Sequence, residues 1–118
     1  MNQILLIIDA QQELIDGNQK VKPVFNKELL VRNINKVIEK AREADVPVVF
    51  IRDLDVAEGK GDGFQIHNEI NVPTEAKIFD KAATNSFYGT GLLEYLKLQH
   101  VKHLVIMGCE TQHCIDSA

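Results

Sequence analysis

The chain has 118 residues, of which 45% are hydrophobic and 25% charged, and it carries a formal net charge of −4. This length and composition are typical of one globular domain and exclude a disordered, collagen-like or disulfide-stapled chain. Each half of the chain carries a net charge of −2, and no apolar run approaches the roughly 20 residues that span a bilayer. We therefore expect no nucleic-acid partner and no membrane partner.

The predicted elements alternate between strands and helices. Short apolar runs indicate strands buried on both faces, and apolar side chains at helical spacing indicate amphipathic helices. The long loop has three glycines and no periodicity, so we expect it to pack over a site. In chain order, the elements are a strand over 3–8, a helix over 28–44, a strand over 48–51, a loop over 53–76, a strand over 77–79, a helix over 91–99 and a strand over 104–107.

This alternation predicts a three-layer α/β/α domain with a mostly parallel, Rossmann-like sheet. The four strands are expected in the order 3-2-1-4. Ligands of such sheets bind beyond the carboxyl ends of the strands. The charged and nucleophilic side chains that follow the four strands are Asp9, then Arg52 and Asp53, then Asp80 and Lys81, then Cys109, Glu110, Thr111, His113 and Cys114.

An acid, an ammonium group and a thiol are therefore expected to meet at one edge of the sheet. A thiol attacks as the thiolate, which a helix N-terminus or a neighbouring cation stabilises. We expect Cys114 to begin a helix and Lys81 to supply the cation. Asp9 is placed to take the thiol proton and pass it to a leaving nitrogen. The alternative is that Cys114 simply packs in the interior, as most buried cysteines do.

At these residues the chain resembles the isochorismatase-like cysteine hydrolases. The resemblance runs from residue 3 to residue 118 and depends on ordered, correctly spaced motifs. The segments that carry it are LLIIDAQ with Asp9 and Gln11, GFQIHNEI with Phe64 and His67, FDKAATNSFYGTGL with Lys81 and Phe87, and GCETQHCIDSA with Thr111 and Cys114.

The resemblance implies a catalytic triad of Asp9, Lys81 and Cys114. It implies cleavage of an amide-type C–N bond of a small molecule through a thioester, without a cofactor. It also implies a cis peptide bond between Glu110 and Thr111 that aims backbone N–H groups at the oxyanion.

Four further residues are candidates for substrate binding, each with a structural alternative. Gln11 either helps the site or hydrogen-bonds the backbone, and Phe64 either forms the pocket wall or belongs to the core. His67 either contacts substrate or is a packed, satisfied histidine, and Phe87 lies beside the site or packs in the core.

Departures from the family pattern narrow this prediction. Isochorismatases proper lack the cysteine, so Cys114 argues against cleavage of a vinyl ether. Nicotinamidases carry histidine metal ligands after the second strand, whereas Asp53 and Asp55 alone would form a poor zinc site. We therefore predict no catalytic metal and do not favour nicotinamide as the substrate.

Relatives continue some 50 or more residues beyond the position of Ala118. The chain is therefore expected to be either a fragment or a truncated form. Two other functions stay open: a non-catalytic paralogue that acts only in assembly, and a thiol redox protein that uses Cys109 and Cys114. The absence of a readable signal peptide predicts a cytoplasmic location, and an exposed parallel edge predicts a homo-oligomer.

Overall fold

The computed structural model describes residues 2–20, 22–82, 91–108 and 112–116, the last of these by their backbone. The elements in chain order are β1 (Gln3–Ile8), α1 (Gln12–Asp16), α2 (Lys27–Glu43), β2 (Val48–Asp53), the 3-10 helix η1 (Val56–Gly59), α3 (Gly61–Phe64), β3 (Lys77–Lys81), α4 (Leu92–Leu98), β4 (His103–Gly108) and β5 (Gln112–Asp116). Among the helices of this part of the chain, none has the length and apolar character that crossing a bilayer requires.

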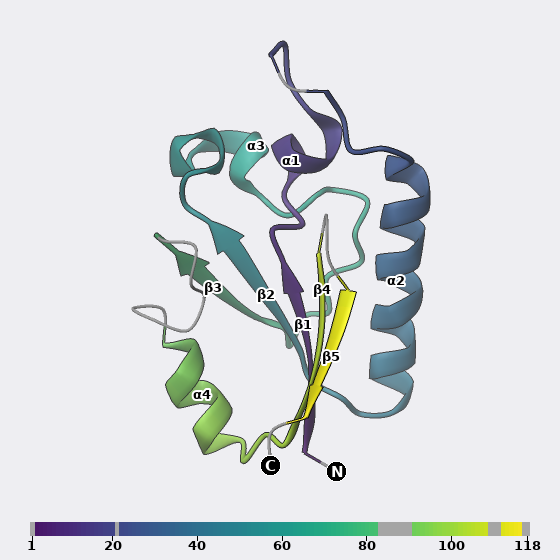
Figure 1. Ribbon diagram of the computed structural model, residues 1–118, viewed down its shortest axis with the longest axis vertical. Helices are drawn as coiled ribbons and strands as arrows, with labels where there is room; N and C mark the ends of the chain where they lie inside the picture. The colour runs from purple at the N-terminus through teal and green to yellow at the C-terminus, as the bar shows by residue number, and fades with distance from the viewer. Residues whose placement is uncertain (1, 21, 83–90, 109–111, 117–118) are drawn as a thin grey trace.

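The described strands form one sheet in the order β3-β2-β1-β4-β5 (Figure 1). The first four pair in parallel, and β5 pairs antiparallel to β4. Parallel neighbours cannot be joined by a tight turn, and here α2 lies between β1 and β2 in the sequence and α4 between β3 and β4. The predicted α/β fold and the predicted 3-2-1-4 order of the parallel strands are confirmed.

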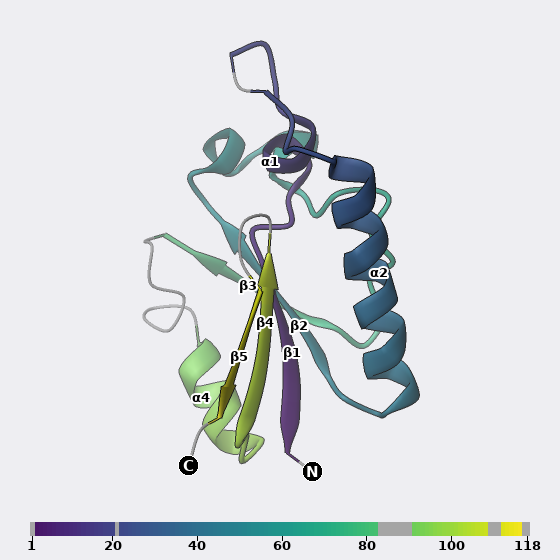
Figure 2. The same ribbon diagram turned by 45° about the vertical axis from the view of Figure 1, so that its right-hand side comes forward.

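Each face of the sheet has its own apolar core, because successive side chains of a strand point to opposite faces. Leu5 and Ile7 of β1 pack with Ile34 of α2 on one face. Ile4 and Leu6 pack with the buried residues of α4 on the other face (Figure 2). Full burial of one such side chain contributes about 1.5–3 kcal/mol, so the two cores together hold the three layers.

Helix α2 begins and ends within one residue of the predicted 28–44. Glu28 in its first turn and Lys40 and Arg42 in its last turn complement the helix dipole. The helix ends before Asp45, whose φ of 56° is incompatible with helical continuation. One stripe of the helix is buried against the sheet, formed by Val31, Ile34, Ile38 and Ala41.

The segment 53–76, predicted as a loop, contains short ordered elements. These are η1 and α3, and Ile66 forms an isolated antiparallel bridge with Gln11. Helix α1 was also not predicted. Elements of four or five residues are too short to show a periodic pattern, and their stability comes from tertiary packing. As expected for this segment, its helices lie at the carboxyl end of the sheet, beside α1 (Figure 1).

The prediction that Cys114 begins a helix is wrong in this structure. Residues Gln112–Asp116 form β5, and the backbone of Cys114 lies opposite Val105 of β4. Without β5, the described part of β4 would have one side unpaired in the sheet. A returning antiparallel strand satisfies the N–H and C=O groups of that open edge, which favours a strand over a helix here.

Alanine at Gly108 is expected to lower the free energy of unfolding. A Cβ atom at this position would lie 2.4 Å from the backbone oxygen of Ile8 on the neighbouring strand. Because that neighbour is backbone inside a sheet, it cannot rotate away, and overpacking of this kind costs about 1–3 kcal/mol or more. Urea unfolding of Gly108→Ala should show the loss as a lower midpoint.

Gly61→Ala is the control for that measurement. No atom lies within 4 Å of a Cβ atom at Gly61, although its φ of +68° adds backbone strain. The loss at Gly108 should therefore exceed the loss at Gly61. Equal midpoints for the unchanged protein and Gly108→Ala would show that β1 and β4 do not approach so closely there.

Candidate active site

The carboxyl edge of the sheet brings Asp9 and Lys81 into contact. The Nζ atom of Lys81 lies 3.4 Å from Oδ1 and 3.5 Å from Oδ2 of Asp9. The Lys81 side chain is 7% exposed, whereas that of Asp9 is 29% exposed. Because β2 lies between β1 and β3, the lysine side chain reaches across the end of the intervening strand.

Backbone hydrogen bonds hold both members of this pair. Asp9 follows β1 with a φ of 60°, and its N–H group donates to the oxygen of Ile51 at 2.9 Å. The backbone oxygen of Lys81 accepts from the N–H group of Leu54 at 2.9 Å. A buried ammonium group is costly unless it is paired, so the position of Lys81 depends on the carboxylate. The result is a proton acceptor beside a fixed cation.

Gln11, predicted to help the site or to bond the backbone, is fully buried and bonds the backbone. Its Oε1 accepts from the N–H group of Asp53 at 2.8 Å. Its Nε2 donates to the oxygen of Phe64 at 2.8 Å and to the oxygen of Asp53 at 3.2 Å. The side chain therefore ties the end of β1 to the end of β2 and to α3.

Phe64 is 5% exposed and lies beneath a guanidinium group. The Cζ atom of Arg52 lies 4.3 Å from the centroid of the ring. Arg52 also donates from Nε and Nη2 to the two carboxylate oxygens of Asp80, at 2.8 and 3.0 Å, and from Nη1 to Gln65 at 2.7 Å. One side chain thus joins β2, β3 and α3.

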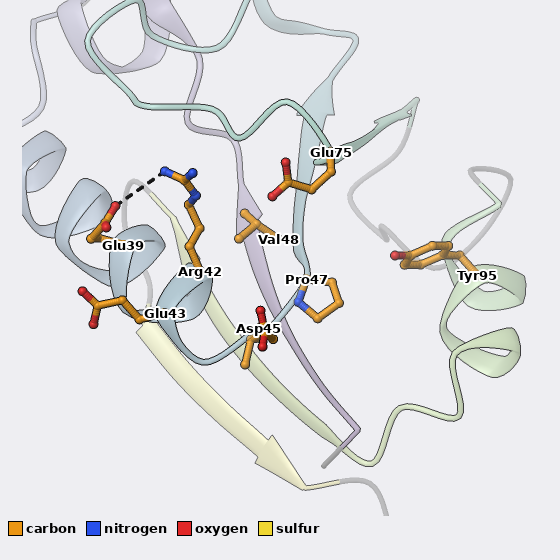
Figure 3. Close-up of a pocket in the computed structure, with 9 residues that line it drawn as sticks. Glu39, Arg42, Glu43, Asp45, Pro47, Val48, Glu75 and Tyr95 are labelled. Carbon is orange, nitrogen blue, oxygen red and sulfur yellow. Dashed lines mark ion pairs between the residues drawn. The ribbon is translucent and has the colours of Figure 1, made fainter.

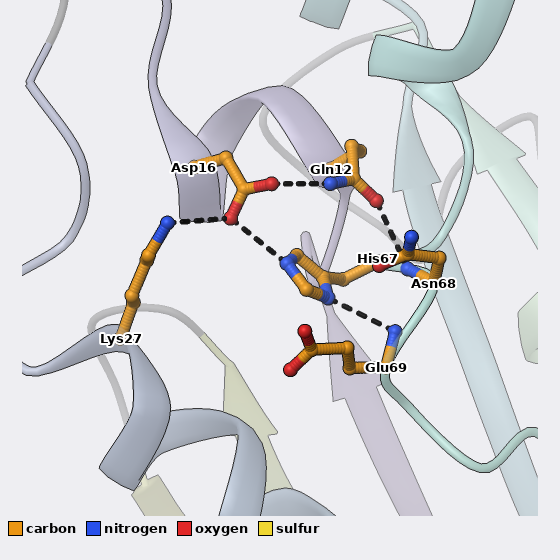
Figure 4. Close-up of polar contacts among 6 residues, drawn as sticks. All are labelled: Gln12, Asp16, Lys27, His67, Asn68 and Glu69. Carbon is orange, nitrogen blue, oxygen red and sulfur yellow. Dashed lines mark hydrogen bonds and ion pairs between the residues drawn. The ribbon is translucent and has the colours of Figure 1, made fainter.

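His67 belongs to a separate polar cluster beside α2 and is 5% exposed (Figure 4). Its Nδ1 accepts from the N–H group of Glu69 at 3.1 Å, so the ring proton is on Nε2. That nitrogen lies 2.9 Å from Oδ1 of Asp16, and Nζ of Lys27 lies 3.3 Å from the same oxygen. Gln12 also bonds Asp16. His67 is therefore a packed and satisfied histidine.

The stability that Asp16 contributes is expected to depend on pH. Burial raises the pKa of Asp16, but hydrogen bonds from His67 and Lys27 outweigh burial and hold the pKa below its ordinary value. A carboxyl group whose pKa is lower in the folded state than in the unfolded state stabilises the fold at pH values above its unfolded-state pKa. This stabilisation is lost as the pH falls through its folded-state pKa.

We therefore expect Asp16→Asn to lower the melting temperature at neutral pH. The difference in melting temperature between Asp16→Asn and the unchanged protein should become smaller below about pH 3.9, the ordinary pKa of aspartate. Thermal unfolding as a function of pH measures it, with the exposed Asp62→Asn as the matched control. A gap that stays constant into acid would contradict the ionic role of Asp16.

The structure describes the remaining predicted site residues incompletely. Phe87, Glu110 and Thr111 lie outside the described residues, and Cys114 is described by its backbone. Val105, opposite Cys114, lies three residues before Gly108 on β4, and Gly108 pairs with Ile8, the residue before Asp9. Three strand residues correspond to about 10 Å. The backbone of Cys114 therefore does not lie level with the Asp9–Lys81 pair.

No group of three or more His, Cys, Asp or Glu side chains that could hold a metal ion lies within the described residues. Asp53 instead accepts from the N–H group of Asp55 at 2.9 Å, in a short turn after β2. His67, the first histidine after that turn, is engaged with Asp16.

A cavity of about 530 Å³ lies at the opposite end of the sheet from the pair (Figure 3). Pro47 and Val48 at the start of β2 line it, with Arg42 of α2 on one side and Tyr95 of α4 on the other. The six residues of β2 separate it from the carboxyl edge by about 17–20 Å. This cavity is therefore not part of the candidate site.

Sequence reasoning missed the partners of three charged residues. It placed Arg52 and Asp80 at the carboxyl edge but did not pair them, and it did not single out Asp16. The available signal for the first pair was opposite charge at the ends of adjacent strands. No comparable signal existed for the pairing of Asp16 with His67, because these two residues lie 51 positions apart in the chain.

The fold and the site together define a class: a mostly parallel three-layer α/β domain with a buried ammonium group paired to a half-buried carboxylate at the carboxyl edge of its sheet. A family model, the Isochorismatase domain, matches residues 3–118. The chain belongs to the isochorismatase family, as its motifs predicted.

Relatives and solved structures support this membership. The chain is 30% identical over 118 residues to the uncharacterized isochorismatase family protein YrdC of Bacillus subtilis, and the match covers 96% of this chain and 62% of YrdC. A crystal structure of an isochorismatase family protein matches with a TM-score of 0.80 at 24% identity, over 91% of this chain and 63% of that one. N-carbamoylsarcosine amidase from Thermoplasma acidophilum matches with a TM-score of 0.75 at 27% identity, over 92% and 68%. The chain thus spans about three fifths of the length of YrdC.

Proposed function

We propose that the protein is a hydrolase that cleaves an amide-type C–N bond of a small molecule, with Cys114 as nucleophile. The observation that carries the proposal is the contact of Asp9 and Lys81 at 3.4 Å, with the ammonium group almost fully buried. Lysine is rarely buried unless it is paired, and ligands of parallel sheets bind at the carboxyl edge, so the position of this pair supports a role in the site. The likeness to an enzyme named as an amidase supports the bond type.

In the first half of the proposed reaction, Asp9 accepts the proton of the Cys114 thiol. The thiolate attacks the carbonyl carbon, and the electron pair of the C=O bond moves to oxygen. When the tetrahedral intermediate collapses, the C–N bond breaks and Asp9 returns the proton to the leaving nitrogen. Lys81 stabilises the negative charge on the thiolate. The products of this half are an amine and a thioester on Cys114.

In the second half, Asp9 takes a proton from water, and the resulting hydroxide attacks the thioester carbonyl. Collapse of the second intermediate breaks the C–S bond, and the proton returns to sulfur. The same carboxylate therefore serves as base and acid in both halves. Backbone N–H groups around Glu110 and Thr111 are proposed to stabilise the oxyanion, and Phe64 and Phe87 to border the substrate.

This proposal requires Cys114 to reach the Asp9–Lys81 pair. In β5 the backbone of Cys114 lies opposite Val105, below the carboxyl edge. Residues 112–116 must therefore leave this pairing with β4 when substrate reacts. The proposal includes a small-molecule amide as the substrate. It also includes a homo-oligomeric assembly of the protein. Sedimentation that shows a monomer alone at micromolar concentration would count against the assembly.

A second candidate function is non-catalytic. The position of Cys114 in β5 favours it, because a nucleophile paired into the sheet opposite Val105 is not at the ligand-binding edge. In that case the chain keeps the family fold and acts only in assembly with other subunits.

Mass spectrometry of the intact protein after incubation with small amides tests these functions. The hydrolase predicts an acyl adduct on Cys114 that disappears as water releases the acid, and Cys114→Ala should bind amides without forming it. Cys114→Ser should be nearly inactive, because a hydroxyl ionises far less readily than a thiol. A Cys109–Cys114 disulfide without any adduct would instead support a redox role, and neither species would support the non-catalytic role.

A further inference from the structure

We propose that Arg52 is a positioning residue that holds Lys81 in place on Asp9 through Asp80. Its effect on turnover rests on the proposed function, whereas the positioning itself can be measured without substrate. The guanidinium group of Arg52 donates to Asp80 and to Gln65, so Arg52 acts on the Asp9–Lys81 pair through its neighbours.

The first step is the geometry of the contact between Arg52 and Asp80. Nε and Nη2 of Arg52 donate in parallel to the two carboxylate oxygens of Asp80, at 2.8 and 3.0 Å. A bidentate contact fixes the orientation of the carboxylate as well as its distance. The Arg52 side chain is 18% exposed and that of Asp80 is 35% exposed, so water competes only partly for this contact.

The second step is the place of Asp80 on β3. This strand is at one end of the described sheet and pairs there with β2. The register sets Arg52 beside Asp80 and Asp53 beside Lys81. Because Asp80 and Lys81 are consecutive in a strand, their side chains point to opposite faces. Fixing Asp80 on one face therefore fixes the direction of Lys81 on the other, at the very end of an edge strand.

The third step is the other side of the guanidinium group. Nη1 of Arg52 donates to Oε1 of Gln65 at 2.7 Å, and the guanidinium group lies over Phe64. Arg52 therefore couples the end of β3 to the residues that follow α3. Phe64 is a candidate pocket wall, so Arg52 contacts both that candidate wall and the residue that precedes Lys81.

The fourth step is charge. Arg52 and Asp80 neutralise each other, which leaves the Asp9 carboxylate as the anion that Lys81 contacts at 3.4 Å. Lysine at position 52 would keep the positive charge but could neither form the bidentate contact nor stack a planar group on Phe64. Arg52→Lys therefore separates the contribution of geometry from the contribution of charge.

The experiment compares Arg52→Gln and Arg52→Lys with the matched control Arg42→Gln. Arg42 is half exposed, forms an ion pair with Glu39 at 3.7 Å and lies at the far end of the sheet. Acetic anhydride is reacted with each full chain at a temperature where it is folded, and acetylation of Lys81 is followed by mass spectrometry. When Arg52 no longer contacts Asp80, Lys81 should be acetylated about five- to tenfold faster than in the unchanged protein, in both Arg52 variants. The control Arg42→Gln should be acetylated at Lys81 as slowly as the unchanged protein.

Steady-state kinetics on an amide substrate gives the second measurement. We expect kcat to fall by about tenfold in both Arg52 variants, because Lys81 is misplaced, and KM to rise about two- to fivefold, because Phe64 loses the planar guanidinium group that stacks on it. A merely structural role would lower the folded fraction without this split between kcat and KM.

Two results would overturn the proposal. One is labelling of Lys81 that stays unchanged in Arg52→Gln. The other is an Arg52→Lys variant that keeps the protection of Lys81, which would show that charge alone suffices. If Lys81 loses protection as expected but no protein turns over any amide, the positioning stands and the proposed function fails.

Discussion

Replacing Asp9 by asparagine is expected to lower amide turnover by about 10²- to 10⁴-fold, the usual range for loss of a general acid–base group. At neutral pH, alkylation of Cys114 by iodoacetamide should stay as fast or become faster. The two effects differ because asparagine cannot accept a proton, and because removal of the carboxylate also removes a negative charge that disfavours the thiolate. Turnover and alkylation are measured on the same preparation.

Lys81→Ala is the counterpart of that variant. It removes the cation that is proposed to stabilise the Cys114 thiolate, so the rise of the alkylation rate should move to higher pH. Lys97→Ala, at an exposed position of α4, is the matched control and should leave the profile in place. Full amidase activity in Asp9→Asn, or an unshifted profile in Lys81→Ala, would show that these residues do not act on Cys114.

Gln11→Ala is expected to cause a larger loss of stability than Asp16→Asn. The variant leaves the partly buried N–H group of Asp53 and the buried backbone oxygen of Phe64 without the partner that the amide provides. Each unsatisfied buried group costs about 1–3 kcal/mol, so a loss of about 3 kcal/mol or more is expected. Urea unfolding measures it, with the exposed Gln19→Ala as control.

The same variant tests the role of Gln11 at the site. If Gln11 acts only through the backbone, then turnover per folded molecule should change little in Gln11→Ala at low temperature. A stability near that of Gln19→Ala, combined with a large rise in KM, would instead show that the amide contacts substrate.

The parallel sheet was predictable because its signals are local. Residues 3–8 and 48–51 are short apolar runs that fit strands buried on both faces, and 28–44 carries an apolar stripe at helical spacing. Their order along the chain then restricts the sheet to a few arrangements, because parallel neighbours need crossover helices. The contact of Asp9 with Lys81 follows from the same reasoning, since carboxyl ends of parallel strands meet at one edge.

The sequence by itself therefore determined the layers, the order of the parallel strands and the edge at which Asp9 and Lys81 meet. Only the tertiary structure decided what depends on partners distant in the chain. Those features are the backbone contacts of Gln11, the contact of Arg52 with Asp80 over Phe64, the pairing of His67 with Asp16, and the strand that places Cys114 opposite Val105. A polar side chain has the same local pattern whether it faces water or a buried partner, and the unpaired edge of β4 exists only once the sheet has formed.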